Sequence, residues 1–276
     1  MNAPSSRWPT STTAGPRRIV CLTEETTELL YLLGEQDRIV GITAYTERPA
    51  EAKRDKPVVS AFVGGSLSRI QALKPDLVVG FSDVQAEYAR ELIHAGLPVL
   101  ITNQRSVAEI LDVMQMLAAL VGAQGRAVAL LDSWRRGLDA AYERGRALQS
   151  RLGKVPRVYF EEWNDPMISC IRWVSELIEV AGGCNVFEAQ AMEPASKGRV
   201  VTVEQVAQAQ PDVMLASWCG KTLDADEVRR RLGSLVPAVA DGRVQEIASE
   251  LILQPGPACL TDGLAAVQQA IWGPTP

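Results

Sequence analysis

Histidine is almost absent from this chain of 276 residues, in which His94 is the only one. Imidazole is the commonest side-chain ligand of transition metals and the usual base of a Ser-His-Asp triad. The sequence therefore argues against histidine-rich metal sites and against triads built on other histidines. His94 lies just before Gly96, which suits the end of a helix, where the helix dipole favours a histidine. We expect a structural role for His94.

Cysteine pairs are also missing. The cysteines are odd in number and never spaced as Cys-x-x-Cys, so neither a disulfide framework nor a zinc ribbon is indicated. Cys219 follows an expected strand and could hold a soft metal, but the further ligands that such a site needs are absent nearby. We expect no metal and no cofactor. The five cysteines are Cys21, Cys170, Cys184, Cys219 and Cys259.

Basic clusters and long apolar runs are lacking as well. The balance of 28 basic and 33 acidic residues gives a net charge of -5, which argues against nucleic-acid binding. No segment approaches the roughly 20 apolar residues of a membrane span. Residues 1–17 are rich in Ser, Thr and Pro and lack the apolar stretch of a secretory signal. We expect a disordered segment there and, from these residues alone, a cytoplasmic protein.

Strand-like runs of aliphatic residues alternate with helical patterns along most of the chain, which predicts βαβ units around parallel sheets. The alternation of strands and helices begins again after an apolar helical pattern that includes Leu131, Trp134 and Leu138. At 1.5 Å per residue this helix would be about 40 Å long, enough to join two α/β lobes. An ordinary crossover helix within one large domain is the alternative. The expected parts are residues 18–122 and 154–276 as lobes and 123–153 as the connecting helix.

A weak internal repeat supports two similar halves. Residues 67–79 and 203–215 share their apolar spacing, and each contains a Pro-Asp pair, Pro75-Asp76 and Pro211-Asp212. Proline pushes its predecessor out of the α region, so each segment predicts a short helix that stops just before a buried strand.

Three segments carry a resemblance to a known family, and they are residues 22–30, Leu73-Lys74-Pro75-Asp76 and Ala181-Gly182-Gly183. In these segments the chain resembles the substrate-binding proteins of metal-chelate ABC importers that have a helical backbone. The resemblance implies a class III periplasmic-binding-protein-like fold, with two Rossmann-like lobes joined by a long backbone helix. It also implies a periplasmic location, a permease partner and no catalysis. In that family one surface carboxylate per lobe contacts the permease. Glu204 keeps the second of these carboxylates, whereas Ser68 replaces the first.

Three segments look most like the cobalamin-binding branch of this family. They are residues 162–166 with 172–174, then 218–220, and 254–257. The branch usually has histidine at the position of Arg172 and proline at that of Trp218. The ligand therefore remains open among a corrinoid, a tetrapyrrole and a siderophore-like chelate.

Polar and aromatic residues follow the expected strands, where ligands of open α/β sheets bind. Tryptophan offers a flat apolar wall with one N–H donor, although these indoles could instead fill the core. The pairs Glu24-Glu25 and Glu161-Glu162 could be solvated, and we expect one member of each pair to contact the ligand. The expected ligand-binding residues are Glu24, Glu25, Tyr45, Phe62, Glu162, Trp163, Arg172, Trp173, Trp218 and Gln254.

Together these features predict a monomer that captures a small metal-chelate-like molecule in a cleft between its lobes. Two alternatives remain. The chain could be an enzyme that uses Glu24, Glu25 or Glu162 as its base. It could also be a cytosolic ligand sensor built on the same fold.

Overall fold

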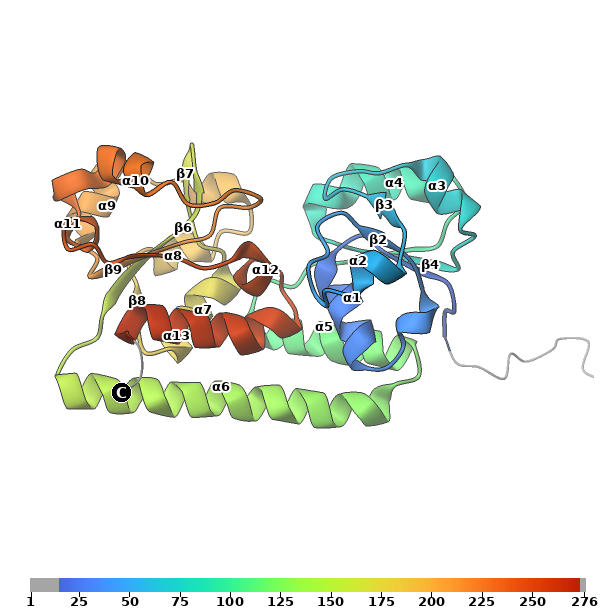
Figure 1. Ribbon diagram of the computed structural model, residues 1–276, viewed down its shortest axis with the longest axis horizontal. Coiled ribbons are helices and arrows are strands. Elements are labelled where there is room, and N and C mark those ends of the chain that lie inside the picture. Colours follow the sequence, from blue (N-terminus) through green and yellow to red (C-terminus); the bar gives the residue numbers. More distant parts are fainter. Residues whose placement is uncertain (1–14, 274–276) are drawn as a thin grey trace, which may run out of the picture.

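The computed structural model describes residues 15–273 and shows two α/β lobes above one long helix, which confirms the predicted fold class (Figure 1). Residues 1–14, most of the segment predicted to be disordered, lie outside the described range. For Pro16 and Arg17 the prediction of disorder is wrong. The carbonyl oxygen of Pro16 accepts a hydrogen bond from Arg38, and the N–H of Arg17 donates one to Asp76.

The N-lobe contains a five-stranded parallel sheet in the order β3-β2-β1-β4-β5. Helices cover both of its faces, and its central strands are apolar and, apart from the half-buried Leu77, buried, as expected for a parallel sheet. The strands are β1 (Ile19–Cys21), β2 (Ile39–Thr43), β3 (Val58–Ser60), β4 (Leu77–Phe81) and β5 (Val99–Thr102). The helices are α1 (Glu24–Leu32), α2 (Ala52–Asp55), α3 (Leu67–Ala72), α4 (Ala86–His94) and α5 (Val107–Leu120), with 3-10 turns at Gln36–Arg38 and Asp83–Gln85.

The C-lobe sheet has the order β10-β9-β6-β7, and β8 also pairs with β6. Only β7 runs antiparallel to its neighbour among the strands of this sheet that the structure describes. The strands are β6 (Arg157–Asn164), β7 (Met167–Ser169), β8 (Cys184–Asn185), β9 (Val213–Ala216) and β10 (Val244–Glu246). The helices are α7 (Arg172–Val180), α8 (Glu188–Ala191), α9 (Val203–Ala209), α10 (Ala225–Leu232), α11 (Pro237–Ala240), α12 (Ser249–Ile252) and α13 (Leu264–Trp272), with 3-10 turns at Ser196–Arg199 and Gly233–Leu235 and a π-helical turn at Cys259–Gly263.

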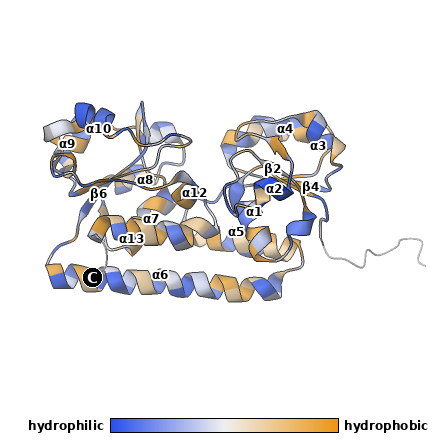
Figure 2. Ribbon diagram, viewed as in Figure 1, coloured by the Kyte–Doolittle hydropathy of each residue, from blue (hydrophilic) through white to orange (hydrophobic). Residues whose placement is uncertain are grey.

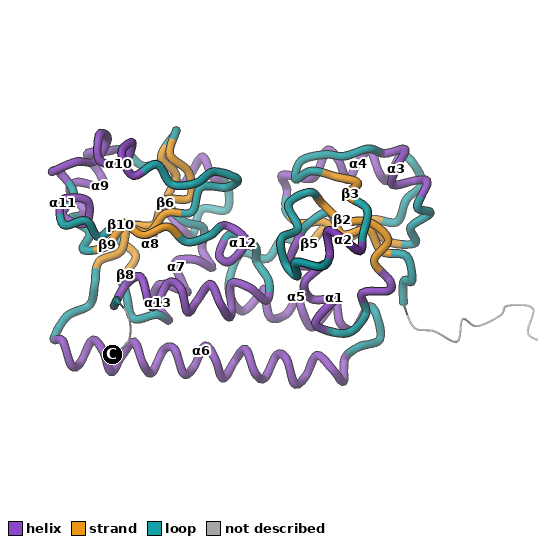
Figure 3. The backbone as a smooth tube through the Cα atoms, in the orientation of Figure 1, coloured by secondary structure: helices purple, strands orange, loops and turns teal. Residues whose placement is uncertain are grey.

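One apolar core runs beneath both lobes. It joins Leu29 of α1, Met114 of α5 and Trp134 of the long helix α6 (Gln124–Leu152) to Phe160 of β6 and Val267 of α13. The opposite faces of the two sheets have separate cores. Figure 3 shows the same arrangement, in which both sheets lie above a layer of α5, α7 and α13 with α6 at the base. The lobes are therefore fused below and separate above.

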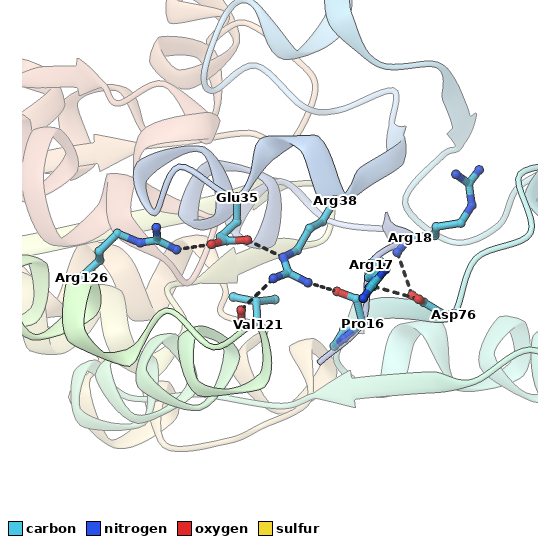
Figure 4. Close-up of polar contacts among 8 residues, drawn as sticks. All are labelled: Pro16, Arg17, Arg18, Glu35, Arg38, Asp76, Val121 and Arg126. Carbon is cyan, nitrogen blue, oxygen red and sulfur yellow. Dashed lines mark hydrogen bonds and ion pairs between the residues drawn. The ribbon is translucent and has the colours of Figure 1, made fainter. Parts of the chain in front are cut away.

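The base helix α6 is amphipathic, and polar and apolar residues alternate along it (Figure 2). Its start is fixed to the N-lobe by a cluster of polar contacts (Figure 4). Arg126 of α6 and Arg38 both pair with Glu35, and Arg38 also donates to the carbonyl oxygen of Val121, 3.1 Å away. These contacts fix the direction in which the helix leaves the lobe.

The two Pro-Asp segments form the same structure in each lobe. The N–H of Arg18 donates to Asp76 at 2.8 Å and that of Arg157 donates to Asp212 at 2.7 Å. Each arginine side chain returns to a carbonyl oxygen at the end of the preceding helix, that of Leu73 or of Ala209. The repeat in the sequence therefore corresponds to one hydrogen-bonding arrangement. In each lobe it attaches the end of a helix to the first strand.

Near its C-terminal end, α6 packs directly on the turn after α7. A Cβ atom added at Gly145 would lie 2.8 Å from the backbone of Gly182, whereas one added at Gly137 of the same helix would meet nothing within 4 Å. Only a residue without a side chain allows this approach.

We expect Gly145→Ala to lower the free energy of unfolding by about 1–3 kcal/mol, because the added methyl group meets backbone that cannot move aside. Gly137→Ala is the matched control. It should raise the free energy of unfolding by about 1 kcal/mol, since alanine favours the helix and has room there. Urea unfolding of both variants measures the difference, and a gain in stability for Gly145→Ala would contradict the close packing.

Candidate functional site

Segments that follow strands of the N-lobe touch α7 and the segment after α12 of the C-lobe, and we call this contact zone the seam. Polar and aromatic contacts cross it. Gln104 donates to the carbonyl oxygen of Pro255 at 3.1 Å, and the N–H of Val107 donates to Glu176 at 2.7 Å. The ring of Phe81, at the end of β4, meets the Trp173 ring edge-on at 6.3 Å between centroids. The seam thus combines polar and aromatic groups from both lobes.

Glu24 and Glu25 form the first turn of α1 and are 2% and 1% exposed. Neither carboxylate oxygen of Glu24 makes a hydrogen bond of normal geometry among the described residues, and Glu25 receives one from Thr23 at 2.6 Å. Burial raises the pKa of Glu24 to about 8, although nearby backbone N–H groups oppose the rise. Burial likewise raises the pKa of Glu25 to about 7, against the opposing effect of Thr23. Both carboxyls are therefore partly protonated near neutral pH.

The segment around Gln254 lies against this acidic turn. A Cβ atom added at Gly256 would come within 2.4 Å of Glu25, so the turn needs glycine there. One turn further along α1, Glu28 accepts hydrogen bonds from Arg48 at 2.9 Å and from the N–H of Ala258 at 3.1 Å. Gln254 itself is half-buried. The predicted motif thus meets the predicted acids, but as a packing contact between lobes.

Three of the predicted aromatic residues keep exposed surface. Tyr45 is 47% exposed, and Phe62 and Trp163 are half-buried. The Trp163 indole donates to the carbonyl oxygen of Asp165 at 2.9 Å, and the Lys221 ammonium lies 4.2 Å from the ring centroid. One face of this indole is therefore already covered by a cation.

Trp173 and Trp218 are core residues, and the expectation that they stand in an open cleft is wrong for this structure. Each is 3% exposed. The Trp173 indole donates to the carbonyl oxygen of Ile252 at 2.9 Å. The Trp218 indole donates to Glu161 at 3.1 Å. Both indole N–H groups are thus satisfied inside the protein, which allows complete burial.

The two glutamates at the end of β6 point in opposite ways, as the alternation of a strand requires. Glu161 is fully buried inside the C-lobe, where it accepts hydrogen bonds from Tyr159 and Trp218 and two from Arg231, at 2.7–3.1 Å. Glu162 remains partly exposed and pairs with Arg199. Glu162 is therefore the member of the pair that a ligand in the seam could reach.

Sequence reasoning missed two arginines of the seam, Arg105 after β5 and Arg199 before α9. Each has a buried Nε atom without a hydrogen-bond partner among the described residues. Arg105 lies three residues beyond the end of β5 and could have been included by the strand-end rule. Arg199 is far from any predicted strand, so no signal in the sequence marks it. The predicted Arg172 pairs with Glu176 at 2.8 Å, on the surface of α7.

Within residues 15–273, no helix is long and apolar enough to cross a membrane, and no group of three or more His, Cys, Asp or Glu side chains could hold a metal ion. Cys219, the one thiol considered as a metal ligand, is exposed, and partial burial and the nearby Glu162 raise its pKa. This thiol is therefore mostly protonated at neutral pH.

Comparison with known proteins places this geometry in a family. The family model described as periplasmic binding protein matches residues 19–251. The uncharacterized ABC transporter substrate-binding lipoprotein YvrC of Bacillus subtilis is 27% identical over 266 residues, which is 94% of this chain and 81% of that protein. The vitamin B12-binding protein of Vibrio parahaemolyticus is 26% identical over 246 residues, 88% of this chain and 85% of that protein. The solved structure of the periplasmic heme-binding protein RhuT from Roseiflexus sp. RS-1 covers 93% of this chain and 100% of its own, with a TM-score of 0.74 and 25% identity.

The buried acids of α1 make the stability of the chain depend on pH. Folding raises the pKa values of Glu24 and Glu25 from 4.5 to about 8 and about 7. At pH values between about 5 and about 8, the folded state therefore binds more protons than the unfolded state. We expect the free energy of unfolding to fall as the pH rises from about 5 to about 8, by at most about 1.4 kcal/mol per pH unit for each group.

Urea unfolding across this pH range measures the effect. The double variant Glu24→Gln, Glu25→Gln keeps the shape of both side chains and removes their titration, so its stability should change less with pH than that of the wild type. Each single variant should show an intermediate slope. A double variant as pH-dependent as the wild type would refute the assignment to these two carboxyls.

Proposed function

Since this chain belongs to the periplasmic binding protein family, we propose that it captures a metal chelate, either a corrinoid, a tetrapyrrole or a siderophore-like compound, in the seam between its lobes. As a member of that family it is a solute-binding protein and not an enzyme, which agrees with the prediction. The class of ligand follows from relatives whose names specify vitamin B12 and heme. We take residues 18–122 and 154–276 as the two lobes that enclose it and 123–153 as their connection.

The observation that carries this proposal is the set of unpartnered buried polar atoms on both sides of the seam. Glu24 and Arg105 belong to the N-lobe, and Arg199 belongs to the C-lobe. A buried polar group without a partner destabilises a fold by about 1–3 kcal/mol, so such groups in both lobes favour a missing partner. A bound molecule with polar groups on its rim would provide such partners.

The shared core beneath the lobes supports capture by a small movement. Residues of α1, α5, α6, α7 and α13 pack into one apolar layer, which would have to break for the lobes to separate widely. The upper parts have separate cores and can tilt without that loss. This arrangement of cores allows a ligand to enter and leave through a slight opening of the seam.

We further propose that the loaded protein docks on an ABC permease outside the cytoplasm. Glu204 is exposed in the first turn of α9, and Ser68 is exposed in α3. Both helices lie on the upper side of the molecule, away from α6 (Figure 1). Glu204 provides a docking charge on one lobe, while Ser68 leaves the other side to be recognised by shape and hydrogen bonding.

Titration of the purified chain with haem, cobalamin, cobinamide and a ferric siderophore tests the proposal, followed by ligand absorbance and tryptophan fluorescence. We expect saturable binding of at least one compound, with a Kd of about 1 μM or lower. Trp163→Ala should weaken it about two- to tenfold, because stacking of rings contributes about 0.5–1.5 kcal/mol.

Trp272→Phe is the control, since the Trp272 indole donates to the carbonyl oxygen of Ala181 near the base helix. This variant should bind like the wild type. A folded protein that binds none of the four compounds would overturn the proposed function.

A further inference from the structure

Arg48 joins the two lobes at the edge of the seam next to α1. It lies in the segment after β2, in the N-lobe. Its Nε atom donates to Glu28 of α1 at 2.9 Å, and one terminal nitrogen donates to Asp262 of the C-lobe, also at 2.9 Å. One guanidinium group thus holds a carboxylate from each lobe. We call these two ion pairs the Arg48 bridge.

The C-lobe end of this bridge is a fixed point. Asp262 belongs to the π-helical turn Cys259–Gly263, whose first residue is buried in the core beneath the lobes. A Cβ atom added at Gly263 would lie 2.2 Å from the carbonyl oxygen of Leu251, so the turn also packs tightly on α12. The position of the Asp262 backbone is therefore set by the base of the molecule.

The N-lobe end of the bridge has room to move. Arg48 lines a hollow of about 440 Å³ together with Tyr31, Glu47 and Pro49, among others. Its side chain is 30% exposed, and that of Asp262 is 61% exposed. The guanidinium group can therefore turn away from Asp262 into solvent without disturbing the apolar core.

Arg48 also separates two like charges. Glu28 and Asp262 bind neighbouring nitrogens of the same guanidinium group, so their carboxylates lie close together. Glu28 is held at the seam, because it also accepts a hydrogen bond from the N–H of Ala258 at 3.1 Å. Without the arginine, the two carboxylates would repel each other across the lobes. The bridge thus replaces a repulsion between the lobes with an attraction.

We propose that the Arg48 bridge controls the opening of the seam, holding the lobes together when it is formed and letting them tilt apart when Arg48 leaves Asp262. This control is a property of the protein without a ligand. Its consequence for binding rests on the proposed function, since a captured molecule leaves only when the seam opens. A broken bridge should therefore speed the release of the ligand.

Two backbone N–H groups report on the opening, because each donates to a carboxylate of the opposite lobe. Val107 of the N-lobe donates to Glu176 at 2.7 Å, and Ala258 of the C-lobe donates to Glu28 at 3.1 Å. Hydrogen exchange at these groups follows the population in which the contact is open. The N–H of Leu22, bonded inside the N-lobe sheet at 2.8 Å, is the reference that only unfolding exposes.

Hydrogen exchange of the ligand-free protein, followed by NMR, tests the inference. Asp262→Asn removes the ion pair between the lobes and keeps the pair within the N-lobe. We expect exchange at Val107 and Ala258 to become about two- to fivefold faster, because a partly exposed ion pair contributes modestly, with Leu22 unchanged. Arg48→Gln also leaves both carboxylates without their cation, so its effect should be larger, about five- to twentyfold.

Lys53→Gln is the matched control, because Lys53 pairs with Glu47 inside the N-lobe, beside the same hollow. It should keep the wild-type rates. Arg48→Gln removes the partner of the buried Glu28, so the double variant Arg48→Gln, Glu28→Gln provides an alternative without an unpaired buried charge, and a thermal melt checks each protein. The double variant should also speed exchange at Val107.

Release of bound haem or cobalamin measures the consequence for the ligand. The loaded protein is mixed with an excess of a competing binding protein, and the absorbance of the ligand is followed by stopped flow. Asp262→Asn should raise the dissociation rate constant about two- to fivefold, in step with the hydrogen exchange. Lys53→Gln should release the ligand at the wild-type rate.

The possible outcomes separate the two proposals. Faster exchange at Ala258 alone in Asp262→Asn would overturn the inference, because the bridge would then hold only its own turn. A rise that includes Leu22 would also overturn it, since the variant would then loosen the N-lobe itself. Unchanged release from a variant with an opened seam would overturn the consequence for binding. Failure of haem and cobalamin to bind would count against the proposed function alone, because exchange in the ligand-free protein still decides the role of the bridge.

Discussion

Both sheets rest on one continuous apolar layer, and the arrangement of the seam depends on that layer. Leu29 of α1, Leu131 of α6 and Leu177 of α7 belong to the same core, although they come from the N-lobe, the base helix and the C-lobe. Separating the lobes completely would expose this surface to water, at about 25 cal/mol for each Å². The strand ends are therefore held opposite one another before any ligand arrives, so little ordering is needed for binding.

The same constraint explains why charged groups at the seam are buried without full pairing. Ordinary cores exclude such groups, because desolvation of an unpaired charge is strongly unfavourable. Here the base core, the capped start of α5 and the contacts of Arg38 fix the positions of the elements that carry them. Glu24 responds by keeping its proton to a higher pH, whereas Arg199 cannot release its proton and takes Glu162 as a partner. The stability of the rest of the fold thus offsets local strain at the site.

The fold was largely predictable because its signals are local. Alternation of aliphatic runs with helical patterns marks the strands, and the Pro-Asp pairs mark the same helix-to-strand junction in each lobe. The structure shows why that junction repeats, since Asp76 and Asp212 accept hydrogen bonds from backbone at the start of the first strand. Lys74 and Gln210, just before each proline, both have a left-handed backbone, with φ values of 47° and 44°. Neighbouring residues determine the strands and the turns at the prolines, so one sequence is enough to reveal them, whereas the two aspartate hydrogen bonds join residues far apart in the sequence.

The site was less predictable because the burial and orientation of its side chains depend on partners that are distant in the sequence. Trp218 follows β9 in a polar context that suggests exposure. Its side chain is instead buried in the C-lobe, where Glu161 accepts a hydrogen bond from the indole N–H. Glu161 can lie there only because Arg231, 70 residues further along, neutralises it. Sequence alternation shows that Glu161 and Glu162 face opposite sides, but not which side is the seam. Arg231 decides this, because its half-buried guanidinium group pairs with Glu161 inside the C-lobe, and Glu162 is left to face the seam.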